Sequence, residues 1–310
     1  MPCHVRKVAA PQMNDSLPNI FGDVSFGIIK ALAYADVFDF PLTPDEIYLY
    51  FIGSFPVERP LINEALAALR TQGRVGERGG YYFLPGRENI VPLRLSCLAP
   101  SLKNWKKVGR FTYLFRFLPW LKLVGVSGAL AMGNSGGDDD IDLVFITDLR
   151  RVWLTRLFVV GLLKLSGQYR SARRIKGRFC PNLFLSTAGM TFTPDLFIAH
   201  EIVQMRPVLA RNGIYEKFLA ANSWLYGYLP NTKKFPEEKE NIKRDLFPQI
   251  FDGLEELARR FQLKYMEKKK TIETTTLAVI ALHPRATKDQ VLAAYESRLT
   301  SLNIERTTAS

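Results

Sequence analysis

The sequence predicts an α+β protein, and three observations carry that prediction. Near the N-terminus helical segments precede two short strands, in the middle apolar strands alternate with helices, and beyond residue 212 the pattern is helical. At 310 residues the chain is long enough for two or three domains. The predicted divisions are a tail at 1–20, a first domain at 21–95, a linking helix at 96–118, a core at 119–211 and a helical region at 212–310.

The composition is that of an ordinary globular protein, with 47% hydrophobic and 23% charged residues. The net charge of +12 favours polyanionic partners such as nucleotides or nucleic acid, although many basic proteins have no such partner. The three cysteines have neither metal-ligand nor disulfide spacing. Residues 1–14 lack the apolar core of a signal peptide, and no apolar run reaches the ~20 residues of a membrane span. We therefore expect a cytoplasmic protein without a membrane partner.

Three helices are predicted in the first domain. Residues 24–34 have helical periodicity. A second helix begins after Thr43, which is a typical N-cap residue followed by Pro44 and two acids, and it extends to about Gly53. The third covers residues 59–72. Its apolar face is formed by Leu61, Ala65, Leu66 and Leu69.

A β-hairpin is predicted next. A strand begins at residues 73–75, Gly79 and Gly80 turn the chain, and residues 81–84 return. Three helices followed by a hairpin resemble a winged helix-turn-helix domain, in which the third helix enters the DNA major groove. The alternative is that this domain packs on its neighbour or on a second subunit. The polar residues of the third helix are Arg59, Asn63, Glu64, Arg70 and Gln72, and the hairpin region adds Arg74, Arg78 and Arg87.

Residues 103–118 form a basic, aromatic-rich helical segment. Such a segment can stack on and neutralise nucleic acid, but a connecting helix with a solvated basic face explains the same residues, and we favour the connecting helix. Further strands are predicted at 121–127, 141–147 and 179–185. Further helices are predicted at 150–166, 194–205, 215–228, 247–268 and 288–302, the last of them capped by Thr287.

Residues 124–146 hold the most informative motif. A strand ends at Ser127 and Gly128, where the missing side chain lets the backbone approach a ligand. A helix beginning at Ala129 would direct free N–H groups and its positive dipole end at that ligand, which is a typical anion site. A polar, glycine-rich loop follows at residues 133–139.

Two aspartates enter the next strand. Asp140 and Asp142 are two residues apart, so they project to the same side while Ile141, Leu143 and Phe145 face the packing. Neighbouring carboxylates repel each other and favour a cation, and Mg²⁺ prefers carboxylate and phosphate oxygens. A phosphate cradle beside a metal site suits phosphoryl or nucleotidyl transfer. The alternative is a solvated acidic turn at residues 138–142.

The spacing of Gly128, Asp140 and Asp142 resembles that of DNA polymerase β-like nucleotidyltransferases. These carry a hydrophobic-Gly-Ser/Gly signature and an Asp-x-Asp pair about a dozen residues later. From about residue 21 to 302, the chain is similar to a prokaryotic group that joins a winged helix to this domain. The stretches that carry the likeness are LVFITDLRRVWLTR, CPNLFLS and DLFIAHEIVQM. The resemblance implies Mg²⁺ or Mn²⁺ on Asp140 and Asp142, with a nucleoside triphosphate (ATP or GTP) as substrate.

The chain departs from that family at two positions. Ala129 stands where the family has Ser, and the strand at 180–186 offers Asn182 where active members bring a third carboxylate. Asparagine can ligate or hydrogen-bond, but it is a poor base. Asp195 is the next acid, and Thr193-Pro194-Asp195 indicates a helix start. The predicted catalytic residues are Asp140, Asp142 and Asn182, and the predicted nucleotide-binding residues are Ser127, Gly128, Ala129, Asn134 and Ser135.

Two other features have alternative interpretations. Residues 167–178, which we call the basic segment, would bind triphosphate or a nucleic-acid acceptor, or form a solvated loop. His200 lies in an apolar helix and is more typical of a packed histidine than of a ligand. The cations of the basic segment are Arg170, Arg173, Arg174, Lys176 and Arg178.

The leading hypothesis is an enzyme that moves a nucleoside monophosphate from a nucleoside triphosphate to an unknown acceptor. The alternative is a winged-helix DNA-binding protein whose nucleotidyltransferase domain is catalytically degenerate and acts as a sensor or scaffold. Ala129, Asn182 and the net charge favour this second hypothesis. A third possibility combines them, with nucleic acid as the acceptor.

Overall fold

The computed structural model describes residues 20–171, 173–233, 250–267, 274–281 and 285–302. Within them the protein is α+β, as predicted, with a mixed sheet in the strand order β6-β3-β4-β5-β8-β7 and a separate two-stranded hairpin. The predicted tail at 1–20, except Ile20, lies outside the described residues. None of the described helices is long and apolar enough to cross a membrane.

The three predicted N-terminal helices and the hairpin are confirmed. Thr43 caps the second helix, because its Oγ1 accepts from the Glu46 N–H at 3.3 Å while Glu46 Oε2 accepts from the Thr43 N–H at 2.8 Å. That helix ends at Leu49, before the predicted end at Gly53. We call the following elements the N-terminal unit: α1 (Ile20–Asp36), α2 (Pro44–Leu49), α3 (Arg59–Thr71), β1 (Gly76–Arg78) and β2 (Tyr81–Phe83).

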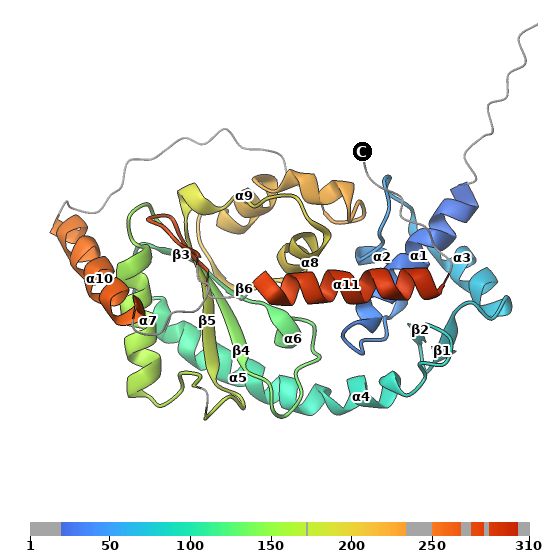
Figure 1. The fold of residues 1–310 in the computed structure, drawn as a ribbon, viewed down its shortest axis with the longest axis horizontal. Coiled ribbons are helices and arrows are strands. Elements are labelled where there is room, and N and C mark those ends of the chain that lie inside the picture. The colour runs from blue at the N-terminus through green and yellow to red at the C-terminus, as the bar shows by residue number, and fades with distance from the viewer. Residues whose placement is uncertain (1–19, 172, 234–249, 268–273, 282–284, 303–310) are drawn as a thin grey trace, which may run out of the picture.

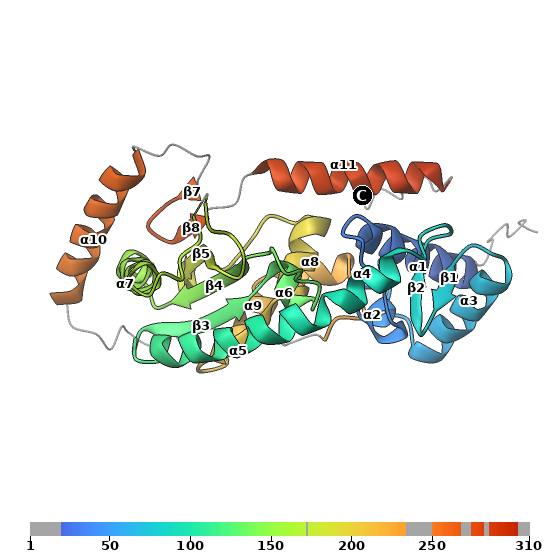
Figure 2. The same cartoon turned by 90° about the horizontal axis from the view of Figure 1, so that it is seen from below.

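A pair of helices connects this unit to the rest of the chain. α4 (Ile90–Ser96) and α5 (Leu98–Phe115) follow one another from the hairpin to the far end of the sheet (Figures 1 and 2). Lys103, Lys106 and Arg110 are exposed on α5, as expected of a connecting helix with a solvated basic face. Lys107 differs: its Nζ donates to the Gly177 carbonyl and lies 5.1 Å from the centroid of the Phe179 ring.

The predicted strands of the core are confirmed. β3 (Leu121–Val126) pairs antiparallel with β4 (Ile141–Thr147), and β4 pairs parallel with β5 (Phe179–Ser186). α7 (Val152–Leu165) connects β4 to β5. β6 (Arg206–Ala210), which the sequence analysis missed, pairs with β3 on its other side.

The prediction of a purely helical region after residue 212 is wrong. β8 (Val279–Ala281) pairs with β5, and β7 (Thr274–Thr275) pairs with β8, so this region completes the sheet. Strands of two and three residues are too short to leave a periodic pattern in the sequence. Thr287 is not a cap, because its helix begins two residues earlier. The helical elements of this region are α9 (Ile214–Ala220), the 3₁₀ turn Ser223–Gly227, α10 (Ile250–Glu267) and α11 (Arg285–Ser301).

The two faces of the sheet have different partners. Ile141, Leu143 and Phe145 pack with buried residues of α5, α7 and α10, as predicted for that side of β4. Val144 and Ile146 lie on the opposite face, in one continuous core with α8 (Leu196–Gln204), α9, α11 and the N-terminal unit. Because side chains alternate along a strand, Asp142 lies on this second face.

A buried carboxylate joins α11 to the N-terminal unit. Asp36 is 5% exposed, and its two oxygens accept from the Nε atoms of Arg87 and Arg298, each at 2.6 Å. Figure 1 shows α11 in red, extending from the sheet to α1. The N-terminal unit is therefore held at two places, by the shared core and by this charge cluster.

Candidate active site

Asp140 and Asp142 point to the same side of β4, as their spacing predicted. Their carboxylate oxygens and the Cys180 Sγ lie within 4.8 Å of one another. Burial, and then the neighbouring Asp140, raise the pKa of Asp142 to about 7. The interpretation of these residues as a merely solvated turn does not fit Asp142, which is half-buried and whose carboxyl lies against Gly128 and Asn182.

Gly128 makes room for this carboxyl. Its φ of +63° is in the left-handed region, and a Cβ at this position would lie 2.5 Å from Asp142 Oδ2. The Ser127 N–H donates to the Asp142 carbonyl at 3.2 Å, which fixes the end of β3 against the start of β4. A glycine is therefore required here both by the backbone and by the close approach.

The helix expected after this glycine is much shorter than the anion-site prediction assumed. α6 (Gly128–Ala131) has four residues. A single turn sums few peptide dipoles, so the predicted positive dipole end is weak. The first N–H groups of the turn still lack intrahelical acceptors, so they keep their capacity to donate to a ligand.

Asn182 is held beside Asp142 by an irregularity in β5. Leu143 pairs with Pro181 and Val144 with Leu183, which leaves Asn182 as an extra residue, as in a β-bulge. Its Nδ2 donates to Asp142 Oδ1, which lowers the pKa of Asp142, and its Oδ1 accepts from the Cys180 thiol at 2.7 Å. Asn182 thus orients a carboxylate and has no proton to exchange.

The basic segment lies against the acidic turn. Arg170 Nε is 2.9 Å from Asp140 Oδ2, and its Nη1 is 3.5 Å from the Cys180 Sγ. The backbones also join, since the Gly177 N–H donates to the Asp139 carbonyl at 2.7 Å. One end of the segment therefore lies beside the carboxylates, while Arg173, Arg174 and Lys176 are exposed to solvent, as in the solvated-loop interpretation. Arg173 and Arg174 line a second hollow, between α7 and α10.

The predicted nucleotide-binding residues divide into two groups. Ser127, Gly128 and Ala129 are together at the end of β3. Ser135 is fully buried: its Oγ accepts from Asn104 Nδ2 at 3.4 Å, so it anchors the loop to α5 and does not face a ligand. Asn134 is intermediate, because it lines the pocket described next while its Nδ2 donates to the Phe38 carbonyl at 3.1 Å.

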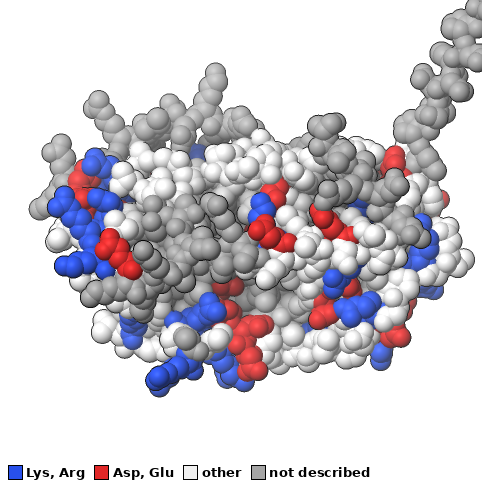
Figure 3. Space-filling model, in the orientation of Figure 1, with Lys and Arg blue, Asp and Glu red and all other residues white. Residues whose placement is uncertain are grey.

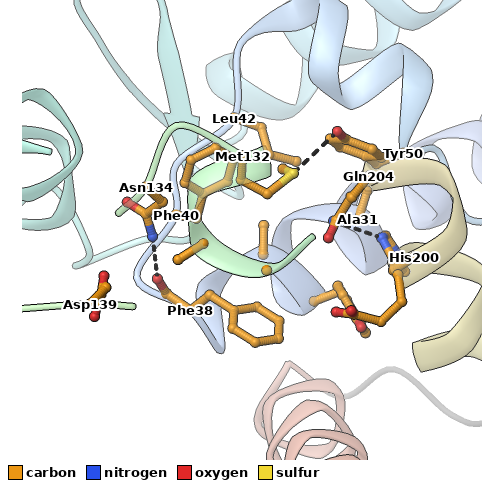
Figure 4. A pocket seen from close by; sticks show the side chains of 15 residues that line it. Ala31, Phe38, Phe40, Leu42, Tyr50, Met132, Asn134, Asp139, His200 and Gln204 are labelled. Carbon is orange, nitrogen blue, oxygen red and sulfur yellow. Dashed lines mark hydrogen bonds between the residues drawn. The ribbon is translucent and has the colours of Figure 1, made fainter. Parts of the chain in front are cut away.

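A pocket of about 260 Å³ opens beside Gly128, between the N-terminal unit and the core (Figure 4). We call it the interface pocket. Its lining residues are Ala31, Tyr34, Ala35, Phe38, Phe40, Leu42, Tyr50, Gly128, Ala129, Met132, Asn134, Asp139, His200, Glu201 and Gln204.

Glu201 is a candidate site residue that the sequence did not predict. It lines the interface pocket, burial raises its pKa to about 7, and its charge contributes to the raised pKa of Asp142. It lies on α8, 21 positions after Cys180, and belongs to no recognisable motif. Its position next to His200 in an apolar helix was the feature of the sequence that could have indicated it. A charged residue on the apolar face of a helix was the available signal.

His200 is packed, as expected, but it is also part of this pocket. Its ring stacks on Tyr34 with centroids 3.8 Å apart, and its Nδ1 lies 3.3 Å from Gln204 Nε2. In the part of the chain that the structure describes, the Nε2 atom has no hydrogen-bond partner, and burial lowers the pKa of His200 to about 3. The ring is therefore neutral at pH 7 with one unsatisfied nitrogen.

The cations expected to face DNA are largely paired within the chain. Arg59 pairs with Asp45, Arg70 with Glu77, and Arg87 with Asp36 and Asp39. On the side of the molecule that faces the viewer in Figure 3, blue basic and red acidic side chains lie next to one another. Among the arginines of the third helix and the hairpin, Arg74 and Arg78 have no acidic partner within the described residues.

No family model, no curated protein and no solved structure matches this chain. The resemblance to polymerase β-like nucleotidyltransferases therefore stays a prediction from the spacing of Gly128, Asp140 and Asp142 in the sequence.

Proposed function

We propose that this protein is a metal-dependent nucleotidyltransferase that moves a nucleoside monophosphate from a nucleoside triphosphate to an acceptor. The observation that carries the proposal is the close approach of Gly128 to Asp142, with Asp140 on the same side of the strand. A backbone without a side chain beside paired carboxylates suits a phosphate group bridged by a cation.

The carboxylates fit a divalent cation. Burial and the neighbouring Asp140 disfavour the anionic form of Asp142, and a cation shared by both groups would stabilise both charges. Mg²⁺ or Mn²⁺ matches these hard oxygen ligands and polarises a phosphate oxygen when bound. In this proposal Cys180 has no ligand role, because a soft thiol matches these hard cations poorly.

The protein's own groups have separate tasks in this proposal. The N–H groups that follow Gly128 donate to the phosphates, and Asn182 keeps the Asp142 carboxylate in position. Arg170, whose side chain is 45% exposed beside Asp140, supplies positive charge for the phosphate oxygens. The attacking hydroxyl forms a bond to the α-phosphorus, and pyrophosphate leaves.

Calorimetric titration with non-hydrolysable ATP and GTP analogues tests the proposal, first with Mg²⁺ and then with EDTA. We expect metal-dependent binding by the wild type and none by Asp140→Ala/Asp142→Ala. Asp138→Ala is the matched control, since its side chain is 89% exposed and pairs with the exposed Lys176. A wild type that binds neither analogue, or a double variant that binds normally, contradicts the proposal.

A DNA-binding protein with a degenerate catalytic domain is the second candidate. The order of three helices and a hairpin, together with the net charge of +12, favours it. It predicts salt-sensitive retardation of duplex DNA in a gel, weakened in Arg74→Ala/Arg78→Ala. Absence of retardation at low salt excludes it.

A further inference from the structure

The interface pocket is too small for a polymer. Ligand pockets commonly measure ~300–1,000 Å³, and this one, at about 260 Å³, suits a molecule with roughly one ring system. From the N-terminal unit, α1 and the segments on either side of α2 line it, and from the core α6 and α8 do so (Figure 4). A ligand here would contact both parts of the protein.

Most of the pocket wall is apolar and aromatic. The rings of Tyr34, Phe40 and Tyr50 are buried in it, while Phe38 is 43% exposed at its edge. Met132 closes one side, with its sulfur 3.3 Å from the Tyr50 hydroxyl. Such a wall favours an apolar body, and aromatic faces also attract cations.

The charged groups of the pocket are acidic. Glu201 and Asp139 line it, and no Lys or Arg does so among the described residues. Burial raises the pKa of Glu201 to about 7, and none of the ion pairs among the described residues involves this carboxyl. A positively charged ligand would compensate its charge, and an anionic ligand would be repelled.

His200 adds a specific polar contact. It is 2% exposed, lines the pocket, and its Nε2 has no partner among the described residues. Gln204 Nε2 lies 3.3 Å from Nδ1, and in the tautomer that lets this amide donate to Nδ1, the ring hydrogen lies on Nε2 and requires an acceptor. Buried donors are almost always satisfied, so a ligand oxygen is the expected partner.

We propose that the interface pocket binds a small molecule with an apolar body, an amino group that pairs with Glu201, and a hydroxyl oxygen that accepts from His200. The pocket adjoins the carboxylates, because Gly128 lines it and touches Asp142. If the proposed function holds, on which this last part rests, this molecule is the acceptor. Its hydroxyl oxygen bonds to the α-phosphorus, the bond to pyrophosphate breaks, and the hydroxyl proton passes to water.

Three probes of nearly equal size test the ligand class by calorimetry on the full chain. Tyramine carries both polar groups, phenethylamine lacks the hydroxyl, and 4-ethylphenol lacks the amine. We expect tyramine to bind at least tenfold more tightly than either of the others. Equal binding of the three probes, or no binding of tyramine, overturns the proposal.

Crossed variants assign the two contacts. Glu201→Gln should weaken the binding of tyramine and phenethylamine about tenfold and leave that of 4-ethylphenol unchanged. His200→Phe should weaken the binding of tyramine and 4-ethylphenol but not that of phenethylamine.

Glu216→Gln, which changes an exposed glutamate on α9, is the matched control for Glu201→Gln. Phe38→Ala, at the exposed edge, should weaken all three probes alike and does not disturb the core. Uniform losses in both crossed variants overturn the assignment.

A fourth titration separates this inference from the proposed function. The Mg²⁺-bound ATP analogue and tyramine should bind together, since an acceptor and a nucleotide occupy adjacent sites. Displacement of tyramine by the analogue overturns the acceptor role and assigns the pocket to the nucleotide base. Tyramine binding without nucleotide binding would support the proposed ligand of the interface pocket and contradict the proposed nucleotidyltransferase activity.

Discussion

The two sides of the carboxylate site differ in how their polar groups are satisfied. On the side of the basic segment, Arg170 pairs with Asp140 and Lys176 with Asp138. On the side of the interface pocket, the described residues offer neither a Lys or Arg in the pocket wall beside Glu201 nor a hydrogen-bond partner for His200 Nε2. Paired charges are explained by the fold itself, whereas unsatisfied buried groups indicate a missing partner.

Gly128 belongs to both sides. It touches Asp142 on the side of the carboxylates and lines the interface pocket on the other. The difference between the sides therefore predicts different responses to substitution: changes at the shared position affect both, and changes on either side affect one.

The largest effect is expected at this shared glycine. Gly128→Ala introduces a Cβ 2.5 Å from Asp142 Oδ2, and it places an alanine in the left-handed backbone conformation that favours glycine. We expect about a hundredfold weaker binding of the Mg²⁺-bound nucleotide analogue, equivalent to about 2.7 kcal/mol. Calorimetry measures this, and Gly109→Ala, where no atom lies within 4 Å of the added carbon, is the control. Unchanged binding in Gly128→Ala would remove the central support for the proposed function.

The second effect concerns stability on the pocket side. Burial lowers the pKa of His200 to about 3, below the ~6.5 of an unfolded histidine. The unfolded chain thus binds the proton more readily, so the stability that neutral His200 contributes is complete above pH 6.5 and is lost as the pH falls toward 3. At pH 5 the loss is about 2 kcal/mol.

Denaturant unfolding at pH 7 and pH 5 measures this loss. The raised pKa of Glu201 has the opposite sign and stabilises the fold as the pH falls, so the curve of the wild type alone is not diagnostic. The informative quantity is the difference between wild type and His200→Phe, which should shrink by about 2 kcal/mol between pH 7 and pH 5. A constant difference would contradict a neutral, buried imidazole.

The smallest effect distinguishes two cations of the basic segment. Arg170→Ala should weaken the binding of the nucleotide analogue about tenfold, since it removes a positive charge beside both carboxylates. Lys176→Ala should change it less than about twofold, because an exposed surface pair contributes little. Tyramine affinity should be unaffected by either, as both lie on the other side. Equal losses in the two variants would mean that the segment acts only through its net charge.

Much of the fold followed from the sequence where local rules apply. The Thr43 cap, the strand at residues 141–147 and the shared orientation of Asp140 and Asp142 depend on neighbours within a few positions, and each was confirmed. The short strands β6 and β8 were missed because their pairing with β3 and β5 is decided by distant segments.

The site was predictable to the same extent. Gly128 was recognised from its motif, whereas Glu201 and the interface pocket arise only when α8 meets the N-terminal unit. Ser135 was misjudged for a related reason, since its burial depends on Asn104 from α5. Residues whose role depends on tertiary contacts leave little trace in a single sequence.

The cluster around Asp36 has a consequence for how the protein is made. Arg298 meets Asp36 across 262 positions of the chain, so α1 leaves the ribosome long before its partner in α11 exists. Until α11 has been synthesised, Asp36 lacks its ion pair with Arg298, and the apolar surface of the N-terminal unit that packs against α11 stays exposed. A nascent chain stalled before α11 should thus be a target for chaperones and proteases, while completion of that one helix ends its exposure.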